Sequence, residues 1–329
     1  MIKSSLIIIN KISKHHYRSS DFFNKIENIL LEFSDSIKQS LSNFEIFKIF
    51  KHNKRLLLFL IQKSIIEIDQ SIFEIISHPK FSHGNYIQFF YHEIKHFLSE
   101  RKIEENKELI DSYDLDKFEE KRKNGENDQF ICQLIRNDLV DDFIVYINKT
   151  NYSITNPIKT SIFETNPFLI KNKNETSLIE YSAFYGSIKI LKYLFFNNAI
   201  LSPSLWFYAI HGKNPEIIHF LEENDVIPID ETYRECFYYS VKCFHDEIAN
   251  YIQDNLIHYT AIICYDSIFK SHNYFFFPKD IQNSSQSFFY LCKYNYVFLV
   301  QMLMMVNNNI DEAIITNFYF IMKFYFNIL

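Results

Sequence analysis

The sequence predicts an all-α protein built from repeated helix–turn–helix units. Three observations support this prediction. Apolar residues recur with a period of about 3.6 along most of the chain, glycine is scarce, and four segments in the second half align without gaps. Of the 329 residues, 47% are hydrophobic and 18% are aromatic, which is enough apolar material for a core and argues against disorder of the whole chain.

The glycine count excludes several classes of functional site. The chain has only four glycines, and no two of them lie within 25 residues of each other: Gly84, Gly125, Gly186 and Gly212. Phosphate-binding loops, dinucleotide fingerprints and nucleophile elbows need clustered glycines, so we expect none of these sites. The same scarcity argues against a β architecture with many tight turns.

The first predicted elements are helices in the N-terminal third. Apolar spacing indicates helices over residues 20–42, 53–65 and 85–99. Ser20 or Asp21 is a suitable N-cap for the first of these helices. The second is apolar on both faces, so we expect it to be buried.

A charged segment then separates two regions. Residues 114–129 ("DLDKFEEKRKNGENDQ") are charged throughout and contain Gly125, which predicts a solvated linker. We therefore expect an N-terminal helical region over residues 1–125 and a repeat array over residues 126–329. Residues 131–147 have the apolar pattern of a weak first unit of that array.

The repeat itself lies in the second region. Four segments of 23 residues align without gaps: 177–199, 204–226, 235–257 and 286–308. The fifth position of each segment is a tyrosine: Tyr181, Tyr208, Tyr239 and Tyr290. A polar turn and then an apolar stripe with i, i+3, i+4 spacing follow each tyrosine. Each segment therefore predicts a short helix, a turn and a second helix that packs on the next unit.

The connections between these units are expected to be irregular. Successive tyrosines are 27, 31 and 51 residues apart. The short connection over residues 200–203 leaves almost no room for a loop, whereas the longest step predicts an insertion over residues 258–285.

The repeated pattern resembles ankyrin repeats. Residues 177–199 match best, with Ser182, Gly186 and Ile190 in the family's small pair, turn glycine and apolar pair. The family's opening motif is lost, and only this unit keeps the turn glycine in register. Three stretches are also similar to a large protist family of degenerate ankyrin proteins that have a helical N-terminal extension and no assigned activity: "EEKRKNGENDQFICQLIRND" (119–138), "SIFETN" (161–166) and "SLWFYAIHGKNPEIIHFLEEN" (204–224). The resemblance implies an ankyrin-like solenoid with irregular or truncated hairpin fingers.

The resemblance also implies a binding surface. In ankyrin proteins, the two residues after the small pair face the concave surface and contact partners. The matching positions include six side chains that we expect to bind a partner protein: Phe184, Tyr185, His211, Lys242, Lys293 and Tyr294. Phe184 and Tyr185 are expected to be exposed aromatic anchors. The alternative is that irregular connections bury these two rings.

A zinc site is the competing prediction. Residues 92–96 read H-E-x-x-H, a string in which two histidines on one helical face bind zinc and the glutamate activates water. No third ligand follows at a known spacing, and Lys95 places a cation inside the string. We therefore expect no metal and no cofactor. A zinc-dependent hydrolase that uses His92, Glu93 and His96 is the alternative function.

Cysteines and apolar runs bear on the compartment. The five cysteines are an odd number without a C-x-x-C pair, which predicts reduced thiols in a cytoplasmic protein. Cys236, Cys243 and His245 are expected to be buried or turn residues rather than zinc ligands. No apolar run reaches the ~18 residues of a membrane span, and the C-terminal "FYFIMKFYFNIL" is expected to form a packed last helix.

These patterns together predict a non-enzymatic scaffold or adaptor that binds another protein. The net charge of −6 provides no basic footprint for nucleic acid, so neither nucleic acid nor a membrane is an expected partner. We expect a monomer. Besides the zinc hydrolase, a purely structural role or a decaying family copy is the remaining alternative.

Overall fold

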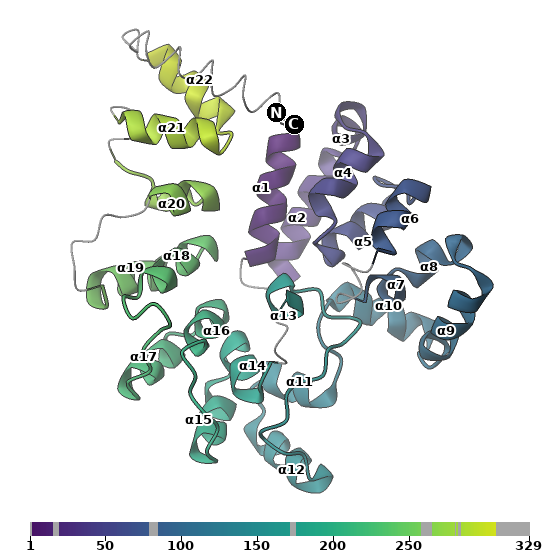
Figure 1. The fold of residues 1–329 in the computed structure, drawn as a ribbon, viewed down its shortest axis with the longest axis vertical. Helices are drawn as coiled ribbons and strands as arrows, with labels where there is room; N and C mark the ends of the chain where they lie inside the picture. Colours follow the sequence, from purple (N-terminus) through teal and green to yellow (C-terminus); the bar gives the residue numbers. More distant parts are fainter. Residues whose placement is uncertain are drawn as a thin grey trace. The chain divides into compact units, whose positions relative to one another are not determined.

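All regular secondary structure that can be described in this protein is helical. The structure is a computed structural model that describes residues 2–15, 20–78, 85–171, 176–257, 265–279, 281 and 284–306. Within these ranges the elements are helices joined by turns (Figure 1), which confirms the predicted all-α class. The chain forms two compact units, one over Ile2–Ile229 and one that begins at Asp230. The boundary predicted at residue 125 stays a prediction.

The first part of the Ile2–Ile229 unit is a cluster of short helices. Their bounds are α1 Ile2–His15, α2 Ser20–Glu32, α3 Ser34–Ser40, α4 Asn43–Phe50, α5 Lys54–Gln62, α6 Gln70–Ile76, α7 Tyr86–Phe89, α8 Tyr91–Ile94, α9 Glu100–Asp111 and α10 Leu115–Asn124. The helix predicted over residues 20–42 is interrupted at Phe33 and becomes α2 and α3. The helix predicted over residues 85–99 is divided into α7, α8 and a 3-10 helix, Lys95–Phe97.

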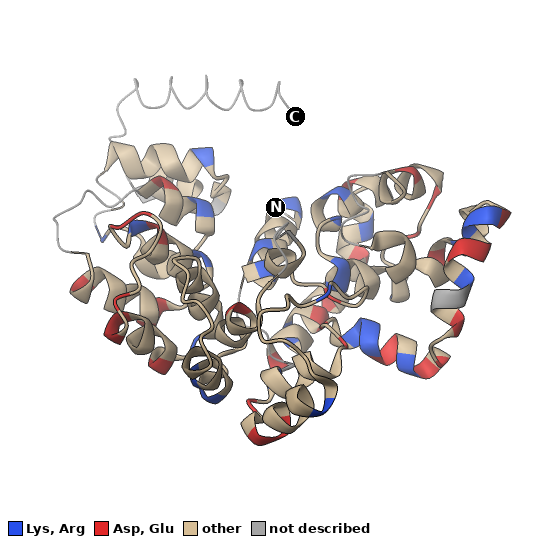
Figure 2. Ribbon diagram, turned by 60° about the horizontal axis from the view of Figure 1, so that its bottom comes forward, with Lys and Arg blue, Asp and Glu red and all other residues tan. Residues whose placement is uncertain are grey.

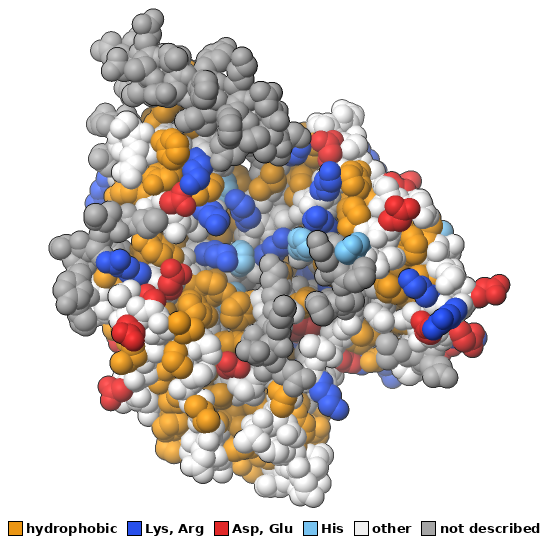
Figure 3. Space-filling model, in the orientation of Figure 1, with side chains coloured by type: hydrophobic (Ala, Val, Ile, Leu, Met, Phe, Trp, Pro, Cys, Tyr) orange, Lys and Arg blue, Asp and Glu red, His pale blue; other side chains and the backbone are white. Residues whose placement is uncertain are grey.

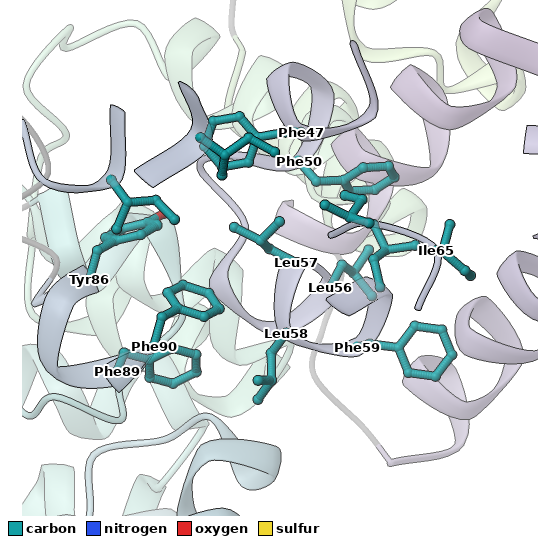
Figure 4. Close-up of a cluster of buried hydrophobic side chains, with 14 of the residues drawn as sticks. Phe47, Phe50, Leu56, Leu57, Leu58, Phe59, Ile65, Tyr86, Phe89 and Phe90 are labelled. Carbon is teal, nitrogen blue, oxygen red and sulfur yellow. The ribbon is translucent and has the colours of Figure 1, made fainter. Parts of the chain in front are cut away.

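Helix α5 lies at the centre of this cluster. The side-chain oxygen of Asn53 caps it by accepting a hydrogen bond of 3.3 Å from the backbone N–H of Leu56. Residues 56–60 are all buried, which confirms that this helix is apolar and packed on both faces. Aromatic side chains from α4 and from the end of α7 pack in the same core (Figure 4): Phe47, Phe50, Phe89 and Phe90.

The charged segment predicted as a linker is a helix with one buried face. At its start, Asp114 accepts a hydrogen bond of 3.0 Å from the backbone N–H of Asp116, and at its end Gly125 is left-handed with φ of 70°. Acidic and basic residues alternate along α9 and α10 (Figure 2). Phe118 and Arg122 are nevertheless each only 1% exposed. The linker prediction was wrong because this segment is a helix with one buried face, although most of its charged side chains are exposed.

The remaining helices form pairs. In the Ile2–Ile229 unit they are α11 Phe130–Arg136 with α12 Val140–Thr150, α14 Leu178–Tyr185 with α15 Ile188–Phe196, and α16 Leu205–Gly212 with α17 Pro215–Glu223. In the unit that begins at Asp230 they are α18 Arg234–Lys242 with α19 Asp246–Asn255, and α21 Ser285–Lys293 with α22 Val297–Val306. The helix pairs predicted for the four aligned segments are thus present in the described residues. Two further short helices are α13 Pro167–Lys171 and α20 Tyr265–Ser271.

First helices pack on first helices. Helix α11 lies against α14 and α14 against α16, while α12 lies against α15. In the other unit, α18 lies against α20 and α20 against α21 (Figure 1). Within each compact unit, consecutive helix pairs are therefore neighbours in space. Helix pairs that bury each other's apolar stripes must be neighbours in this way.

The segment that connects α12 and α14 closes back on the N-terminal helices. Thr165 donates two hydrogen bonds to the backbone oxygen of Gly125, from its N–H (3.0 Å) and from its hydroxyl (2.8 Å). The ammonium of Lys54 donates to the backbone oxygens of Ile162 (2.9 Å) and Glu164 (3.0 Å). The stretch around residues 162–165 thus joins α5 and α10 to the helix pairs.

Two remaining predictions concern membrane-spanning helices and the C-terminal segment. None of the helices in the described ranges has both the length and the apolar character that a membrane span requires. The C-terminal "FYFIMKFYFNIL", predicted as a packed helix, lies outside the described residues.

Candidate interaction surface

The helix pairs share one backbone turn. The tenth residue of every aligned segment has a positive φ: Gly186 (73°), Lys213 (51°), Phe244 (59°) and Asn295 (64°). Only one of the four is glycine, although this left-handed conformation costs other residues about 1–2 kcal/mol. The left-handed turn is therefore present in the backbone geometry of the three segments that lack glycine at this position.

Hydrogen bonds repeat with the turn. The N–H of the left-handed residue donates to the carbonyl three residues earlier: Gly186 to Ala183 (3.2 Å), Lys213 to Ile210 (3.3 Å), Phe244 to Val241 (3.2 Å) and Asn295 to Cys292 (3.1 Å). The next N–H donates to the carbonyl five residues earlier in three units: Ser187 to Ser182 (2.9 Å), His245 to Ser240 (3.0 Å) and Tyr296 to Leu291 (2.9 Å). This second bond is typical of a helix that ends in a left-handed residue.

The same turn occurs at two further places. Asp138, between α11 and α12, has φ of 49°, and its N–H bonds the carbonyl of Ile135 at 2.9 Å. This supports the weak unit predicted over residues 131–147. His272, directly after α20, has φ of 59°, and its N–H bonds the carbonyl of Phe269 at 3.3 Å. The region predicted as an insertion therefore contains another first helix with the shared turn.

Side chains just after these turns bond the preceding first helix. The hydroxyl of Ser187 donates to the backbone oxygen of Ile135 (2.5 Å), and the amide of Asn273 donates to that of Val241 (3.1 Å). Both acceptors lie three residues before the left-handed residue of the preceding unit. The amide of Asn214 makes a related bond of 2.8 Å to the backbone oxygen of Gly186. Neighbouring helix pairs are thus connected by polar bonds as well as by apolar packing.

The recurrent tyrosines occupy equivalent places on the first helices, five residues before the turn. Tyr181 and Tyr208 are each 2% exposed, whereas Tyr239 and Tyr290 are half-buried. The hydroxyl of Tyr181 accepts a hydrogen bond of 2.9 Å from Arg136, and burial raises the pKa of this tyrosine well above its ordinary value. Tyr181 therefore serves as a buried contact between α11 and α14.

Phe184 and His211 were expected on an accessible surface, but they are only 5% and 4% exposed. The ring of Phe168, from α13, covers them, with ring centroids 5.9 Å from Phe184 and 4.7 Å from His211. The same ring lies 4.9 Å from Tyr208. Exposure of Phe184 was predicted wrongly, because the irregular connection before α14 supplies a side chain that fills this surface. Tyr185 beside it is half-buried.

The equivalent surface of the unit that begins at Asp230 is more accessible. Lys242, Lys293 and Tyr294 are all partly exposed. The ammonium of Lys293 lies 2.5 Å from Oδ1 of Asp266, and the hydroxyl of Tyr294 donates to the same oxygen at 2.8 Å. The hydrogen bond that Lys293 donates to Asp266 is the largest cause of its raised pKa, which is about 12.

Sequence reasoning missed Lys270. It lies two residues before the left-handed His272 on α20, which is the place that Lys242 and Lys293 occupy on their helices, and it is exposed. The tyrosine pattern did not reveal this unit because Ser267 stands at the tyrosine position. The run Lys270-Ser271-His272-Asn273, a polar turn after a short helix, was the available signal.

The H-E-x-x-H string has a structural role in this fold. The guanidinium of Arg122 binds both carboxylate oxygens of Glu93, at 2.8 and 2.9 Å. It also donates to Glu119 (2.5 Å) and to the backbone oxygen of Phe89 (2.8 Å). Because Arg122 is 1% exposed, Glu93 is needed to balance a buried charge.

The two histidines of the string have different surroundings. The helix changes from α8 to the 3-10 helix between them. The ring of His92 packs against Phe118 at 5.2 Å between centroids, whereas His96 is exposed. Among the described residues, no group of three or more His, Cys, Asp or Glu side chains is placed to hold a metal ion.

Cys236, Cys243 and His245 are buried, as predicted. The two cysteines are each 0% exposed and His245 is 1% exposed, whereas Cys292 is half-buried. Burial raises the pKa of the Cys243 thiol to about 12, so this thiol is poorly suited to act as a nucleophile. Comparisons of the chain with protein-family models, with curated proteins and with solved structures gave no match.

Proposed function

We propose that this chain is a non-enzymatic protein-binding scaffold, built as a degenerate ankyrin-like solenoid. The observation that carries the proposal is the recurrent left-handed turn, which gives successive first helices equivalent ends. Each helix pair is too small to bury its apolar stripe alone. Stacking on a neighbour buries it, and a linear stack of equivalent helices leaves a long surface available for recognition.

The place two residues before each turn is the candidate contact position. In the Ile2–Ile229 unit this place holds the half-buried Arg136 and the buried Phe184 and His211. In the unit that begins at Asp230 it holds Lys242, Lys270 and Lys293, none of which is buried. We therefore assign partner binding to the second unit rather than to the aromatic residues first expected to provide it.

Partner capture with matched variants tests this proposal. The full chain carries a proximity-labelling tag as wild type, as a Lys242→Ala/Lys270→Ala/Lys293→Ala variant, and as a control with three exposed lysines of α12 and α15 replaced: Lys149→Ala/Lys189→Ala/Lys192→Ala. Because both triple variants remove the same charge, non-specific attraction changes equally. Circular dichroism confirms that each variant keeps its helices.

The proposal expects partners that are retained by the control and lost by the Lys242→Ala/Lys270→Ala/Lys293→Ala variant. Identical partner sets for all three proteins would show that this surface does not bind the partners. A chain that enriches no protein above a tag-only sample would instead support the purely structural alternative.

A further inference from the structure

One aromatic side chain of the Ile2–Ile229 unit lies in a site that two neighbouring helix pairs form. We propose that residues 166–170 are a strap that covers an aromatic-binding site on α14 and α16, and that a partner protein places an aromatic side chain in this site when the strap opens. The site consists of the rings of Phe184, Tyr208 and His211. This inference goes beyond the proposed function, because it concerns the Ile2–Ile229 unit and not the lysines of the second unit.

The walls of the site are rigid. Helices α14 and α16 make the most extensive helix–helix contact among the described elements. The backbone at Gly212 approaches the backbone oxygen of Ala183 so closely that no Cβ would fit between them. The amide of Asn214 adds a hydrogen bond of 2.8 Å to the backbone oxygen of Gly186. The two helices therefore keep the rings of the site in fixed positions.

The ring of Phe168, which is part of the strap, is surrounded by the three rings of the site. It stacks on Phe184 at an interplanar angle of 11°, with centroids 5.9 Å apart, and it meets Tyr208 edge-on at 76° and 4.9 Å. The ring of His211 is tilted by 51° at a distance of 4.7 Å. Offset stacking and edge-to-face contact are the favourable geometries of aromatic pairs. The site is thus shaped for a flat aromatic ring.

The strap is held less firmly than the walls. Helix α13 has five residues, and a helix of this length is not stable by itself. The N–H of Phe168 donates to Oδ1 of Asn166 (2.8 Å), and the N–H of Ile170 donates to the backbone oxygen of Asn166 (3.0 Å). Both bonds lie inside the strap, so they persist when it moves. Phe168 is only half-buried, whereas each ring of the site is at most 5% exposed.

The chain is fixed on both sides of the strap. Before it, Thr165 bonds the backbone oxygen of Gly125, and Lys54 bonds the connecting segment as well. After it, the backbone oxygen of Thr176 accepts a hydrogen bond of 2.8 Å from the N–H of Ile158. Opening of the strap therefore leaves the rest of the unit in place. Local openings of this kind need much less free energy than unfolding of a whole domain.

The ring that fills the site indicates what a partner must offer. Phe168 is followed by Leu169, which is only 7% exposed, so the strap buries an aromatic and an adjacent aliphatic side chain. Figure 3 shows further hydrophobic side chains at the surface over the part of the molecule that α14–α17 form. Aromatic side chains that fill pockets are typical anchors of protein interfaces. We therefore assign the site to a partner segment in which an aromatic residue precedes an aliphatic one.

Fluorine NMR with a peptide of the strap's own sequence tests this inference on the full chain. The probe has the sequence of residues 165–170 with para-fluorophenylalanine in place of the phenylalanine. Its line width is measured while protein is added, which detects weak binding. An unlabelled peptide of the same sequence should displace the probe, whereas a peptide with alanine in place of the aromatic residue should not.

Three protein variants separate the site from other effects. Phe168→Ala removes the ring that fills the site. Phe196→Ala is the control, because it removes a ring on α15 that is 76% exposed. We expect Phe168→Ala to bind the probe at least about tenfold more tightly than the wild type and the control, in which the strap competes for the site. Phe168→Ala/Phe184→Leu keeps an apolar wall without the stacked ring and should lose most of this gain. Circular dichroism confirms that each variant keeps its helices.

Hydrogen exchange of the wild type measures opening of the strap itself. The N–H of Ile170 should exchange at least about tenfold faster than that of Ala183 inside α14. Equal protection of the two N–H groups would overturn the inference, because the strap would then be a permanent part of the core.

Three binding outcomes would also overturn it. Phe168→Ala does not bind the probe, the wild type binds it as tightly as Phe168→Ala, or the alanine peptide displaces it. A dimer of the wild type that is lost in Phe168→Ala would assign the site to the strap of a second copy of the chain instead of a partner. Partner labelling with the lysine variants tests the proposed function separately, because those lysines lie in the other unit.

Discussion

The hydroxyl of Tyr296 donates a hydrogen bond of 2.8 Å to the backbone oxygen of Phe269. Tyr296 follows the left-handed residue of one unit, and Phe269 lies near the end of the preceding first helix. Asn273 and Val241 have the same relation one unit earlier, with a bond of 3.1 Å. A serine, an asparagine and a tyrosine thus make the same type of hydrogen bond at equivalent positions. Because the three residues differ, a search for identical residues does not detect this bond.

Replacing Tyr296 by phenylalanine is expected to lower the free energy of unfolding by about 0.5–1.5 kcal/mol, the net contribution of one hydrogen bond. The ring stays, but the backbone oxygen of Phe269 loses one of its two donors and keeps only the N–H of His272. Urea denaturation followed by circular dichroism measures the change. The matched control is Tyr274→Phe, because the Tyr274 side chain is 52% exposed. Equal effects in the two variants would contradict a structural role for the Tyr296 bond.

Substitutions at the shared turn are expected to change the stability of the protein in opposite directions in two neighbouring helix pairs. Lys213→Gly stabilises by about 0.5–1 kcal/mol, because Lys213 is exposed and adopts φ of 51°, which glycine accepts without strain. Gly186→Ala destabilises, because φ is 73° and an added Cβ would lie 2.8 Å from the backbone oxygen of Gly212. Thermal melting of both variants checks the signs. Two shifts in the same direction would show that the turns are not equivalent.

The helix pairs could be predicted from the sequence because their apolar stripes have the helical period. The turn of each pair could be placed as well, since a polar interruption separates the two stripes. The pair that begins with α20 was missed for two local reasons. Ser267 replaces the tyrosine, and the second helix is reduced to a 3-10 turn, Tyr274–Phe276.

The exposure of the candidate site could not be predicted in the same way. Phe184 has the expected position on α14, but Phe168 covers it from a connection that belongs to no aligned segment. Burial at a solenoid surface depends on such tertiary contacts, which the repeat pattern does not contain. The lysines were partly found because Lys242 and Lys293 lie inside aligned segments, whereas Lys270 does not.

The ion pair between Arg122 and Glu93 makes a strong prediction for stability. Arg122→Ala is expected to lower the free energy of unfolding by about 3–5 kcal/mol, because it leaves Glu93 without its bidentate partner at a site shielded from water. The exposed pair of Arg101 and Glu105 provides the control, and Arg101→Ala should cost less than about 0.5 kcal/mol. Chemical denaturation that gave similar values for the two arginines would contradict a structural role for the Glu93 carboxylate.

The same ion pair leads to a prediction about metal content. Because Arg122 engages both oxygens of Glu93, we expect purified protein to contain well below one zinc per chain by elemental analysis. His92→Ala and His96→Ala should leave that content unchanged. One tightly held zinc per chain that is lost in His92→Ala would restore the hydrolase alternative.

Lys54 is expected to make stability depend on pH above neutrality. Lys54 is 1% exposed, and burial lowers the pKa of its ammonium from 10.5 to about 7, while the charge of Glu164 opposes this shift. Between these two pKa values the unfolded chain binds a proton that the folded chain releases, so stability rises with pH across the window. Below pH of about 7 both states are protonated, and the contribution is constant.

Urea denaturation at several pH values measures this effect as the difference in the free energy of unfolding between the wild type and Lys54→Met. The contributions of other titrating groups cancel in this difference. Each pH unit inside the window is worth about 1.4 kcal/mol, so the wild type should gain up to about 3 kcal/mol relative to Lys54→Met between pH 7 and 9.5. The neighbouring Tyr86 does not interfere, because burial raises the pKa of its hydroxyl far above this range. Exposed Lys48→Met is the control and should keep the wild-type slope. A constant difference between wild type and Lys54→Met would show that the bonds from Lys54 to Ile162 and Glu164 hold a charged ammonium throughout.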